Sequence, residues 1–574
     1  MLFYKNRSLI KKSTNWLLIF LAGIVLLLPI IVPMFPRGYP QTWDSEAHLV
    51  RMAAFHKSII DGQIPPRWVT SLAFDYGSPV LMFNWSLPYW LAEPFLFLNF
   101  SLIDSLKLVT VLSLILSFFT MFLFLKTWLS KWPAFTGAFF YCWAPFRFNL
   151  LYLTGAIGTS VSFIFVPMIF LATILSFQSF YKKSIILGSV CFALLMLSHQ
   201  VTLLLFLPLW LAFTLLFLFS KRNLVAFIAS ITSLIFGLLL SSFFWIPAFI
   251  ETKYLNFEAV LGLHKINYLP LDLLSKKIPT EPYMVDWLSQ YSIGIPQIGI
   301  AIFSLFTIIF LLIITTKKSK KSKIFIKFFL LFTGFFAIGT FFITSYSSFF
   351  WDNLPLLKNF LYPQRFIALL VFTSSILTTL FISLINRQQK LIGLFVIFIT
   401  AFFNYPEIRQ TINRINRPDT FYQSSDKLPD MWGEFLPKWA NKQFYFISDY
   451  ERLSNVVNVV SGETIVSSLQ LNTASILFKI SSKTPVTIKL RQFYFPGWKI
   501  YANNINVPIE IGPNGEMVFK LQQGNFLIRV NFEKTHIRTA SFFLTIASII
   551  IFILFLIKSP YYFQKKLKKE EIKI

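Results

Sequence analysis

Residues 16–33 have the sequence WLLIFLAGIVLLLPIIVP, an apolar run long enough to cross the hydrocarbon core of a bilayer. The chain of 574 residues is 55% hydrophobic and only 13% charged, with a mean hydropathy of +0.64. We therefore expect a polytopic α-helical membrane protein with about twelve transmembrane helices. Runs of spanning length occur near 15–35, 108–125, 133–152, 159–179, 184–199, 201–220, 224–246, 294–315, 324–345, 365–386, 390–404 and 539–558.

Basic residues between these runs predict the orientation. The formal net charge is +27, but Lys and Arg are spread over short connections instead of forming one nucleic-acid-binding patch. A cytoplasmic N-terminus places all of these clusters on the cytoplasmic side, as the positive-inside rule requires. The clusters are Lys126 and Lys131, Lys182 and Lys183, Lys221 and Arg222, Lys317 to Lys323, Arg387 and Lys390, and the tail from Lys558.

This orientation requires that residues 80–101 do not cross the membrane. Pro79, Pro88 and Pro94 interrupt the segment, and Glu93 adds a charge. These residues favour an interfacial or re-entrant helix over a spanning one. The first outer loop then extends from about 36 to 107, which is long for a connection.

A polar region follows the helices. Short β-prone runs at 475–480 and 486–490 precede turn residues at Asn503-Asn504 and at Pro513-Asn514-Gly515, a pattern typical of strands and hairpins. We expect a transmembrane domain over 1–404, an extracytoplasmic β-rich, β-sandwich-like domain over 405–538, and a final helix with a basic cytoplasmic tail over 539–574.

Ionisable residues are concentrated just after the first apolar run, where residues 43–51 have the sequence WDSEAHLVR. Asp44, His48 and Arg51 are spaced i, i+4 and i+7, so a helix would place them on one face. An acid, a base and a cation together indicate catalysis or binding, with Asp44 as a general base or, if a metal ion is used, as its ligand. The alternatives are a charged helix in the headgroup region and an N-capping role for Asp44.

Further candidates lie at the predicted outer ends of the spans. His199 interrupts two apolar runs and could face the same cavity as Asp44, or could simply cap a hairpin. Arg365, Arg67 and Arg51 are suited to a lipid phosphate, although such cations often only meet headgroups. Arg147 is placed similarly to Arg365, and Glu251, at the outer end of a span, could be a second carboxylate.

The order of several motifs resembles that of YfhO-like bacterial membrane proteins, labelled 6-pyruvoyl-tetrahydropterin synthase-related, within the GT-C glycosyltransferase superfamily. The resemblance covers nearly the whole chain. After the Asp44 segment, the motifs are Asp61–Trp68 (DGQIPPRW), Tyr76–Pro79 (YGSP), Leu197–His199 (LSH), Phe244–Pro247 (FWIP) with Glu251, Pro363–Phe366 (PQRF), Phe493–Trp498 (FYFPGW), Gly524 and Thr535–Arg538 (THIR).

This resemblance implies transfer of a sugar from a polyprenyl-phosphate carrier to a glycan or cell-wall polymer outside the cytoplasm, at the bacterial plasma membrane. It implies a catalytic acid in the first outer loop, a position that Asp44 matches. The label implies no pterin chemistry, since no His cluster suited to zinc is seen. Thr154 and Thr159 stand where an Arg and a Glu are expected, which indicates a different substrate or a loss of activity.

No nucleotide-binding motif is present, which agrees with a lipid-linked donor. Two other classes of function stay open. A transporter or flippase of lipid-linked glycans would also need cations for phosphate, but it would spread charges through the middle of its spans. A non-catalytic cell-envelope assembly subunit would agree with Thr154 and Thr159.

Overall fold

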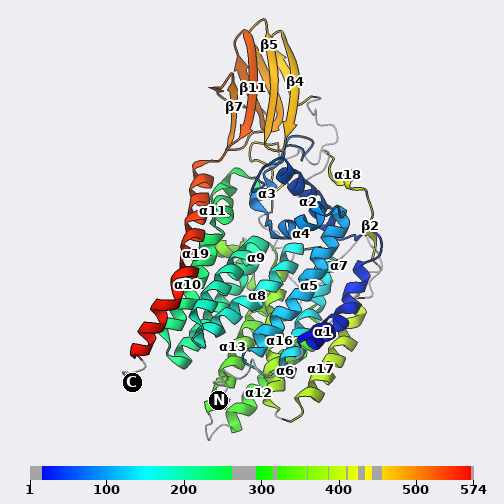
Figure 1. The fold of residues 1–574 in the computed structure, drawn as a ribbon. Coiled ribbons are helices and arrows are strands. Elements are labelled where there is room, and N and C mark those ends of the chain that lie inside the picture. The colour runs from blue at the N-terminus through cyan, green and yellow to red at the C-terminus, as the bar shows by residue number, and fades with distance from the viewer. Residues whose placement is uncertain are drawn as a thin grey trace.

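The fold is described from a computed structural model, which covers residues 16–260, 292–314, 320–358, 360–385, 387–408, 412–424, 433–441 and 455–570. A bundle of long helices carries a β-sheet domain at one end (Figure 1). The last helix, α19 (His536–Glu570), descends from the β domain along the side of the bundle to its opposite end.

Nine helices in the described ranges are long and apolar enough to cross a membrane, or ten if one bent pair counts as a span. Their apolar side chains form the membrane-spanning bundle, and several face outwards, as expected for contact with lipid. The long helices are α1 (Trp16–Ile31), α5 (Leu102–Lys126), α8 (Ile157–Phe177), α9 (Tyr181–Lys221), α12 (Ile295–Ile314), α13 (Lys320–Ile343), α16 (Ile367–Leu384), α17 (Gln389–Asn404) and α19.

The helix α9 supplies two passes because it doubles back at His199. Its 41 residues would extend about 61 Å if straight, twice the thickness of the hydrocarbon core. Its backbone leaves the helical conformation at His199, with φ −168° and ψ 95°. The rings of Phe192 and Trp210 lie 5.0 Å apart, whereas residues so spaced in a straight helix would be about 27 Å apart. The two predicted runs at 184–199 and 201–220 are the two arms of this hairpin.

Two other predicted spans are broken, so the count by length is below the expected twelve. The run at 133–152 forms α6 (Lys131–Cys142) and α7 (Pro145–Tyr152), each too short to span. Pro145 disfavours a helical conformation for the residue before it, which ends α6. The run at 224–246 forms α10 (Leu224–Leu240) and α11 (Ser242–Glu251), bent by 69°.

Short helices cover the end of the bundle next to the β domain: α2 (Ser45–Ile60), α3 (Val80–Phe83) and α4 (Leu87–Phe97). The 11 residues of α4 extend only about 16 Å, too little to cross a bilayer. Strands β1 (Tyr39–Pro40) and β2 (Arg414–Ile415) pair beside them, and α18 (Asp419–Tyr422) contacts α2. Short helices elsewhere are α14 (Ser348–Asn353) and α15 (Pro355–Lys358), with a 3-10 turn at Pro363–Phe366.

The β domain contains two antiparallel sheets that share one hydrophobic core, so it is a β-sandwich. Alternate residues such as Ile476, Phe478 and Ile480 are buried, as expected for strands with one face inward. The predicted turn at Asn503-Asn504 joins two strands with both residues at positive φ. One sheet has the order β3 (Val457–Ser461), β6 (Val486–Phe493), β10 (Glu516–Leu521), β9 (Glu510–Ile511); the other has β4 (Thr464–Asn472), β5 (Ser475–Ser482), β11 (Gly524–Phe532), β7 (Trp498–Ala502), β8 (Ile505–Val507).

The loop after α2 fastens the β domain to the bundle. Trp68 is completely buried and its indole N–H donates to Gln492 Oε1 at 2.8 Å. The Phe493 N–H donates to the Tyr76 carbonyl at 2.7 Å. Two of the motifs that carry the family resemblance, Asp61–Trp68 and Tyr76–Pro79, are therefore part of the join between the domains.

The basic connections meet at the end of the bundle away from the β domain. Three hydrogen bonds connect segments there: Gln178 to Thr127 (3.4 Å), Ser130 to Gln389 at the start of α17 (2.7 Å), and Lys182 at the start of α9 to Leu556 of α19 (2.6 Å). The predicted clusters at Lys126/Lys131, Lys182/Lys183 and Lys390 thus share one end. Lys317 and Lys318, from another of the predicted clusters, lie outside the described residues.

Candidate functional site

Asp44 sits at the N-cap position of α2, but its side chain makes no capping hydrogen bond. The segment is held instead by its backbone, since the Asp44 N–H donates to the Thr154 carbonyl at 3.0 Å. Gly155 has φ +70°, and a Cβ there would lie 2.1 Å from Thr42 Oγ1, so the close contact of the two segments requires glycine. The carboxylate is therefore fixed in place by its backbone and is not used for capping.

Charged groups from distant parts of the chain act on the Asp44 carboxylate. Burial raises its pKa to about 6, the positive charges of Arg51 and Arg365 oppose this rise, and the negative charge of Glu434 adds to it. A carboxylate with a pKa near 6 is about 90% ionised at pH 7 and still basic enough to take a proton. Its raised pKa marks Asp44 as a candidate functional group.

His48 lies one turn further along α2 and is almost completely buried. Its Nδ1 is 3.0 Å from the Tyr89 hydroxyl, and its ring lies 5.1 Å from that of Trp85. Burial, and then the charge of Arg51, hold the pKa of His48 well below its usual range, so the imidazole is neutral. Its Nε2 is buried without a hydrogen-bond partner in the described part of the chain, which leaves this atom for a substrate.

The two cations of the site, Arg51 and Arg365, come from distant parts of the sequence. Arg51 is buried, hydrogen-bonds the Tyr89 hydroxyl and lies 5.7 Å above the ring of Phe435. Arg365 lies 5.2 Å above the ring of Tyr362, at the turn before α16. Burial raises the pKa of Tyr362, and the charges of Arg365, Asp44 and Glu434 also act on it. The site therefore combines two guanidinium groups with two carboxylates.

His199 joins the site from the hairpin of α9. Its Nδ1 accepts a hydrogen bond from the Thr202 backbone N–H at 3.2 Å, so it caps the second arm of the hairpin as the sequence suggested. Because Nδ1 is an acceptor, the neutral ring carries its proton on Nε2. The ring lies 6.2 Å from that of Trp85, and the charge of Arg365 acts on it. The capping and site roles are thus compatible in one residue.

Three predicted residues lie away from this cluster. Arg67 follows the far end of α2, which is about 24 Å long, and the charges that act on it are those of Arg538 and Glu251. Glu251 accepts from Arg538 Nε at 2.9 Å in a fully buried ion pair. Arg147 is buried within the bundle, 4.0 Å above the ring of Phe163.

The second carboxylate of the site is Glu434, which the sequence analysis missed. It lies in an irregular segment with no helical or strand period, so no local pattern indicates it. Tyr89, Tyr362 and Trp85 were also missed. Aromatic residues are frequent throughout the chain, and only the fold distinguishes these three.

Thr154 and Thr159 are close to the site, where the resemblance predicts charged residues. The Thr154 carbonyl binds the Asp44 N–H, and its hydroxyl donates to the Asn149 carbonyl at 3.3 Å. Thr159 lies in the first turn of α8. Thr154 and Thr159 therefore add no charge to the site.

The described residues contain no group of three or more His, Cys, Asp or Glu side chains that could hold a metal ion. Two guanidinium groups also act on the Asp44 carboxylate and already supply positive charge there. Guanidinium groups and carboxylates are therefore the charged groups that the described residues supply to this site.

The fold and the site define a class: a polytopic membrane protein with a β-sandwich before its last helix and a carboxylate flanked by guanidinium groups beneath that sandwich. Residues 82–409 match the family model of the 6-pyruvoyl-tetrahydropterin synthase related domain, described as a membrane protein. This match covers more than half of the chain, and the chain belongs to that family. No curated protein matches it.

Proposed function

We propose that this protein is a membrane glycosyltransferase of GT-C type, which transfers a sugar from a polyprenyl-phosphate donor to a glycan or cell-wall polymer. The observation that carries the proposal is the Asp44 carboxylate, with a pKa near 6 and two guanidinium groups acting on it. The resemblance of the ordered motifs to YfhO-like proteins supports the same assignment.

The reaction is a single displacement. Asp44 takes the proton of an acceptor hydroxyl as its oxygen attacks the anomeric carbon of the sugar. The bond from that carbon to the phosphate oxygen breaks, and polyprenyl phosphate leaves with the bonding electrons. Arg51 and Arg365 stabilise the negative charge that develops on the leaving phosphate. His48 donates or accepts a hydrogen bond through Nε2 to orient the acceptor.

The distribution of charge favours an enzyme over a flippase. The ionisable residues of the site gather where α2, the α9 hairpin and the turn before α16 meet, beneath the β domain. A flippase would need polar groups along the whole path through the bilayer. The β-sandwich stands directly over this end of the bundle (Figure 1), where it could bind and orient a polymeric acceptor.

The proposed orientation is a cytoplasmic N-terminus with the β domain outside the bacterial plasma membrane. It is supported by the basic connections, which meet at the end of the bundle opposite the β domain. Both native cysteines, Cys142 and Cys191, are buried, so a single introduced cysteine can report the side of the membrane. On intact cells, a membrane-impermeant maleimide should label Ser467→Cys in the β domain and should not label Gln388→Cys.

Transfer is tested with purified protein in nanodiscs and a panel of short-chain polyprenyl phosphates that carry radiolabelled hexoses. Release of polyprenyl phosphate in the presence of a cell-envelope extract is the expected result, and Asp44→Asn should reduce its rate at least about 100-fold. Glu46→Gln, an exposed charge change on the same helix, is the matched control. Equal rates for wild type and Asp44→Asn would refute the base assignment.

Failure of every donor with wild-type protein would refute the glycosyltransferase. A parallel assay then separates its rivals. Movement of a fluorescent lipid-linked glycan across the bilayer would identify a flippase, whereas the absence of both activities would indicate an assembly subunit.

A further inference from the structure

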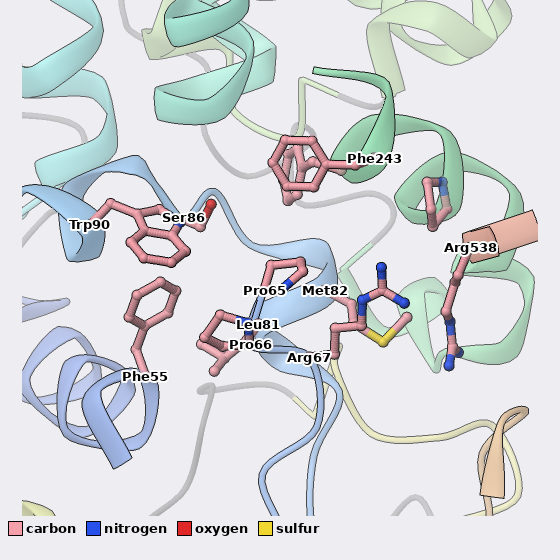
Figure 2. Close-up of a pocket in the computed structure, with 12 residues that line it drawn as sticks. Phe55, Pro65, Pro66, Arg67, Leu81, Met82, Ser86, Trp90, Phe243 and Arg538 are labelled. Carbon is pink, nitrogen blue, oxygen red and sulfur yellow. The ribbon is translucent and has the colours of Figure 1, made fainter. Parts of the chain in front are cut away.

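A pocket that is partly open to solvent lies between the loop after α2 and the helices α11 and α19, apart from the Asp44 cluster. Figure 2 shows Arg67 pointing into this hollow, with Phe243 on one side of it and Pro65 on the other. The walls are mainly apolar and aromatic. They include Phe55, Trp90 and Phe243, with Ser86, Arg67 and Arg538 as the polar members.

The two arginines of the pocket differ in their bonding. Each nitrogen of the Arg538 guanidinium has a protein partner, since its Nε donates to Glu251, its Nη2 to the Pro496 carbonyl and its Nη1 to the Glu533 carbonyl. Arg67 is only 9% exposed, and both of its Nη atoms are buried with no hydrogen-bond partner among the described residues. Arg538 is therefore a structural residue, while the Arg67 guanidinium is left without its acceptors.

The charge around Arg67 is also unbalanced. Among the described residues, Glu251 is the one carboxylate whose charge acts on Arg67, and it is already bound to Arg538 and to the Thr535 hydroxyl. Burial, and then the charge of Arg538, lower the pKa of Arg67 to about 10, which still leaves it charged at neutral pH. Since an unpaired buried charge costs several kcal/mol, the pocket is suited to an anion.

The surroundings indicate what else the anion carries. The helices that border the pocket expose apolar side chains outwards, such as Phe249 on α11 and Phe543 on α19, at 78% and 63% exposure. The two Nη atoms of an arginine match two oxygens of one phosphate. The aromatic walls match an apolar chain. The pocket lies between apolar helices and a polar domain, and the phosphates of a bilayer lie at the same kind of boundary between apolar and polar surroundings.

We propose that the Arg67 pocket binds the phosphate of an amphiphile, with the phosphate on the Arg67 guanidinium and the apolar part against the Phe55, Trp90 and Phe243 walls. This site is additional to the donor phosphate site at Arg51 and Arg365. It does not depend on the proposed transfer reaction, because it predicts binding in the absence of any acceptor or turnover.

Binding is measured by native mass spectrometry and by thermal unfolding of the full chain after delipidation in detergent. Four probes separate the sources of the phosphate: dioleoyl phosphatidylglycerol, farnesyl phosphate, inorganic phosphate and dioleoylglycerol. Both phosphate-bearing amphiphiles should bind and raise the unfolding midpoint, inorganic phosphate should bind at least tenfold more weakly, and dioleoylglycerol should not compete. Preference between the first two identifies a phospholipid headgroup or a phosphate monoester.

Arg67→Gln should weaken the binding of both amphiphiles at least tenfold, and Arg67→Lys should lie between it and wild type. Lys57→Gln, which removes a nearby exposed cation, is the matched control and should bind normally. Without lipid, Arg67→Gln should unfold at the same temperature as wild type or higher, because it removes an unpaired charge. A purely structural Arg67 would lower that temperature.

Phe243→Ala gives a second test that leaves Arg67 in place. It should weaken binding of the amphiphiles and leave that of inorganic phosphate unchanged. Unaltered affinity in Arg67→Gln would overturn the proposal, as would equal binding of dioleoylglycerol. Binding of oleate as tight as that of phosphatidylglycerol, and equally dependent on Arg67, would overturn the assignment to phosphate.

Discussion

Replacement of Asp44 by Asn should stabilise the protein at neutral pH while it removes transfer. The pKa of Asp44 rises from 3.8 to about 6 on folding, chiefly through burial. The folded state thus holds this proton more tightly than the unfolded state, and stability falls as the pH rises from about 4 to 6. At about 1.36 kcal/mol per pKa unit, this pKa shift corresponds to about 3 kcal/mol of stability. This figure is an upper limit, because Asp44 keeps some contact with solvent.

Asparagine has the same shape and no charge, so it avoids this cost at every pH. We expect the unfolding midpoint of Asp44→Asn in detergent to exceed that of wild type by several degrees at pH 7 and to equal it near pH 4. Transfer should fall about 10²- to 10⁴-fold, the usual effect of losing a general base. In wild type, the transfer rate should fall about tenfold per pH unit below about pH 6.

The matched control is Glu46→Gln, which removes an exposed carboxylate two residues further along. It should change neither the pH dependence of unfolding nor the rate by more than about twofold. A midpoint for Asp44→Asn that is lower than wild type at pH 7 would contradict the argument, because it would mean that the carboxylate is stabilised by its neighbours instead of strained by burial.

Three further substitutions separate catalytic from structural charges. Arg365→Gln should reduce kcat for transfer about 100-fold or more without lowering the unfolding midpoint; unchanged kcat would remove Arg365 from the phosphate site. Glu251→Gln should destabilise the protein by about 3–5 kcal/mol, because it leaves Arg538 charged and buried; chemical denaturation should show a smaller loss for the double variant Glu251→Met with Arg538→Met, which removes the buried charge together with its partner. Arg147→Met should keep full transfer and equal or raise the midpoint, because Arg147 has Nε and Nη1 unpartnered within the described residues; loss of transfer in a folded variant would return it to the site.

The sequence predicted most of the fold because each pattern reports a local physical requirement. Long apolar runs predicted the spanning helices, and the alternation at 475–480 predicted a strand of the sandwich. Asp44, His48 and Arg51 belong to one cluster because the helical period places them on one face of α2. The break between α6 and α7 was missed, although Pro145 marks it and could have been used.

Other parts of the site depend on contacts that no local pattern contains. Arg67 was grouped with Arg51 and Arg365 because all three are cations at the predicted outer face. The 16 residues of α2 separate it from Asp44, and the loop after α2 turns towards the β domain. Glu434 belongs to the site although no sequence pattern indicates it. It lies in an irregular segment almost 400 residues from Asp44, and its charge raises the pKa of Asp44.

The motifs that carry the family resemblance therefore divide into two groups with different physical roles. Asp44, His48, Leu197–His199 and Pro363–Phe366 bring ionisable groups to one cluster. Asp61–Trp68, Phe493–Trp498 and Thr535–Arg538, with Glu251, make the buried bonds that join the sandwich to the bundle. A reaction on a polymer held beneath the sandwich would need both groups, because the carboxylate can take a proton only from an acceptor that the rigid join keeps within hydrogen-bonding distance. Substitutions in the second group should thus raise KM for the acceptor before they affect kcat, whereas those in the first should lower kcat directly.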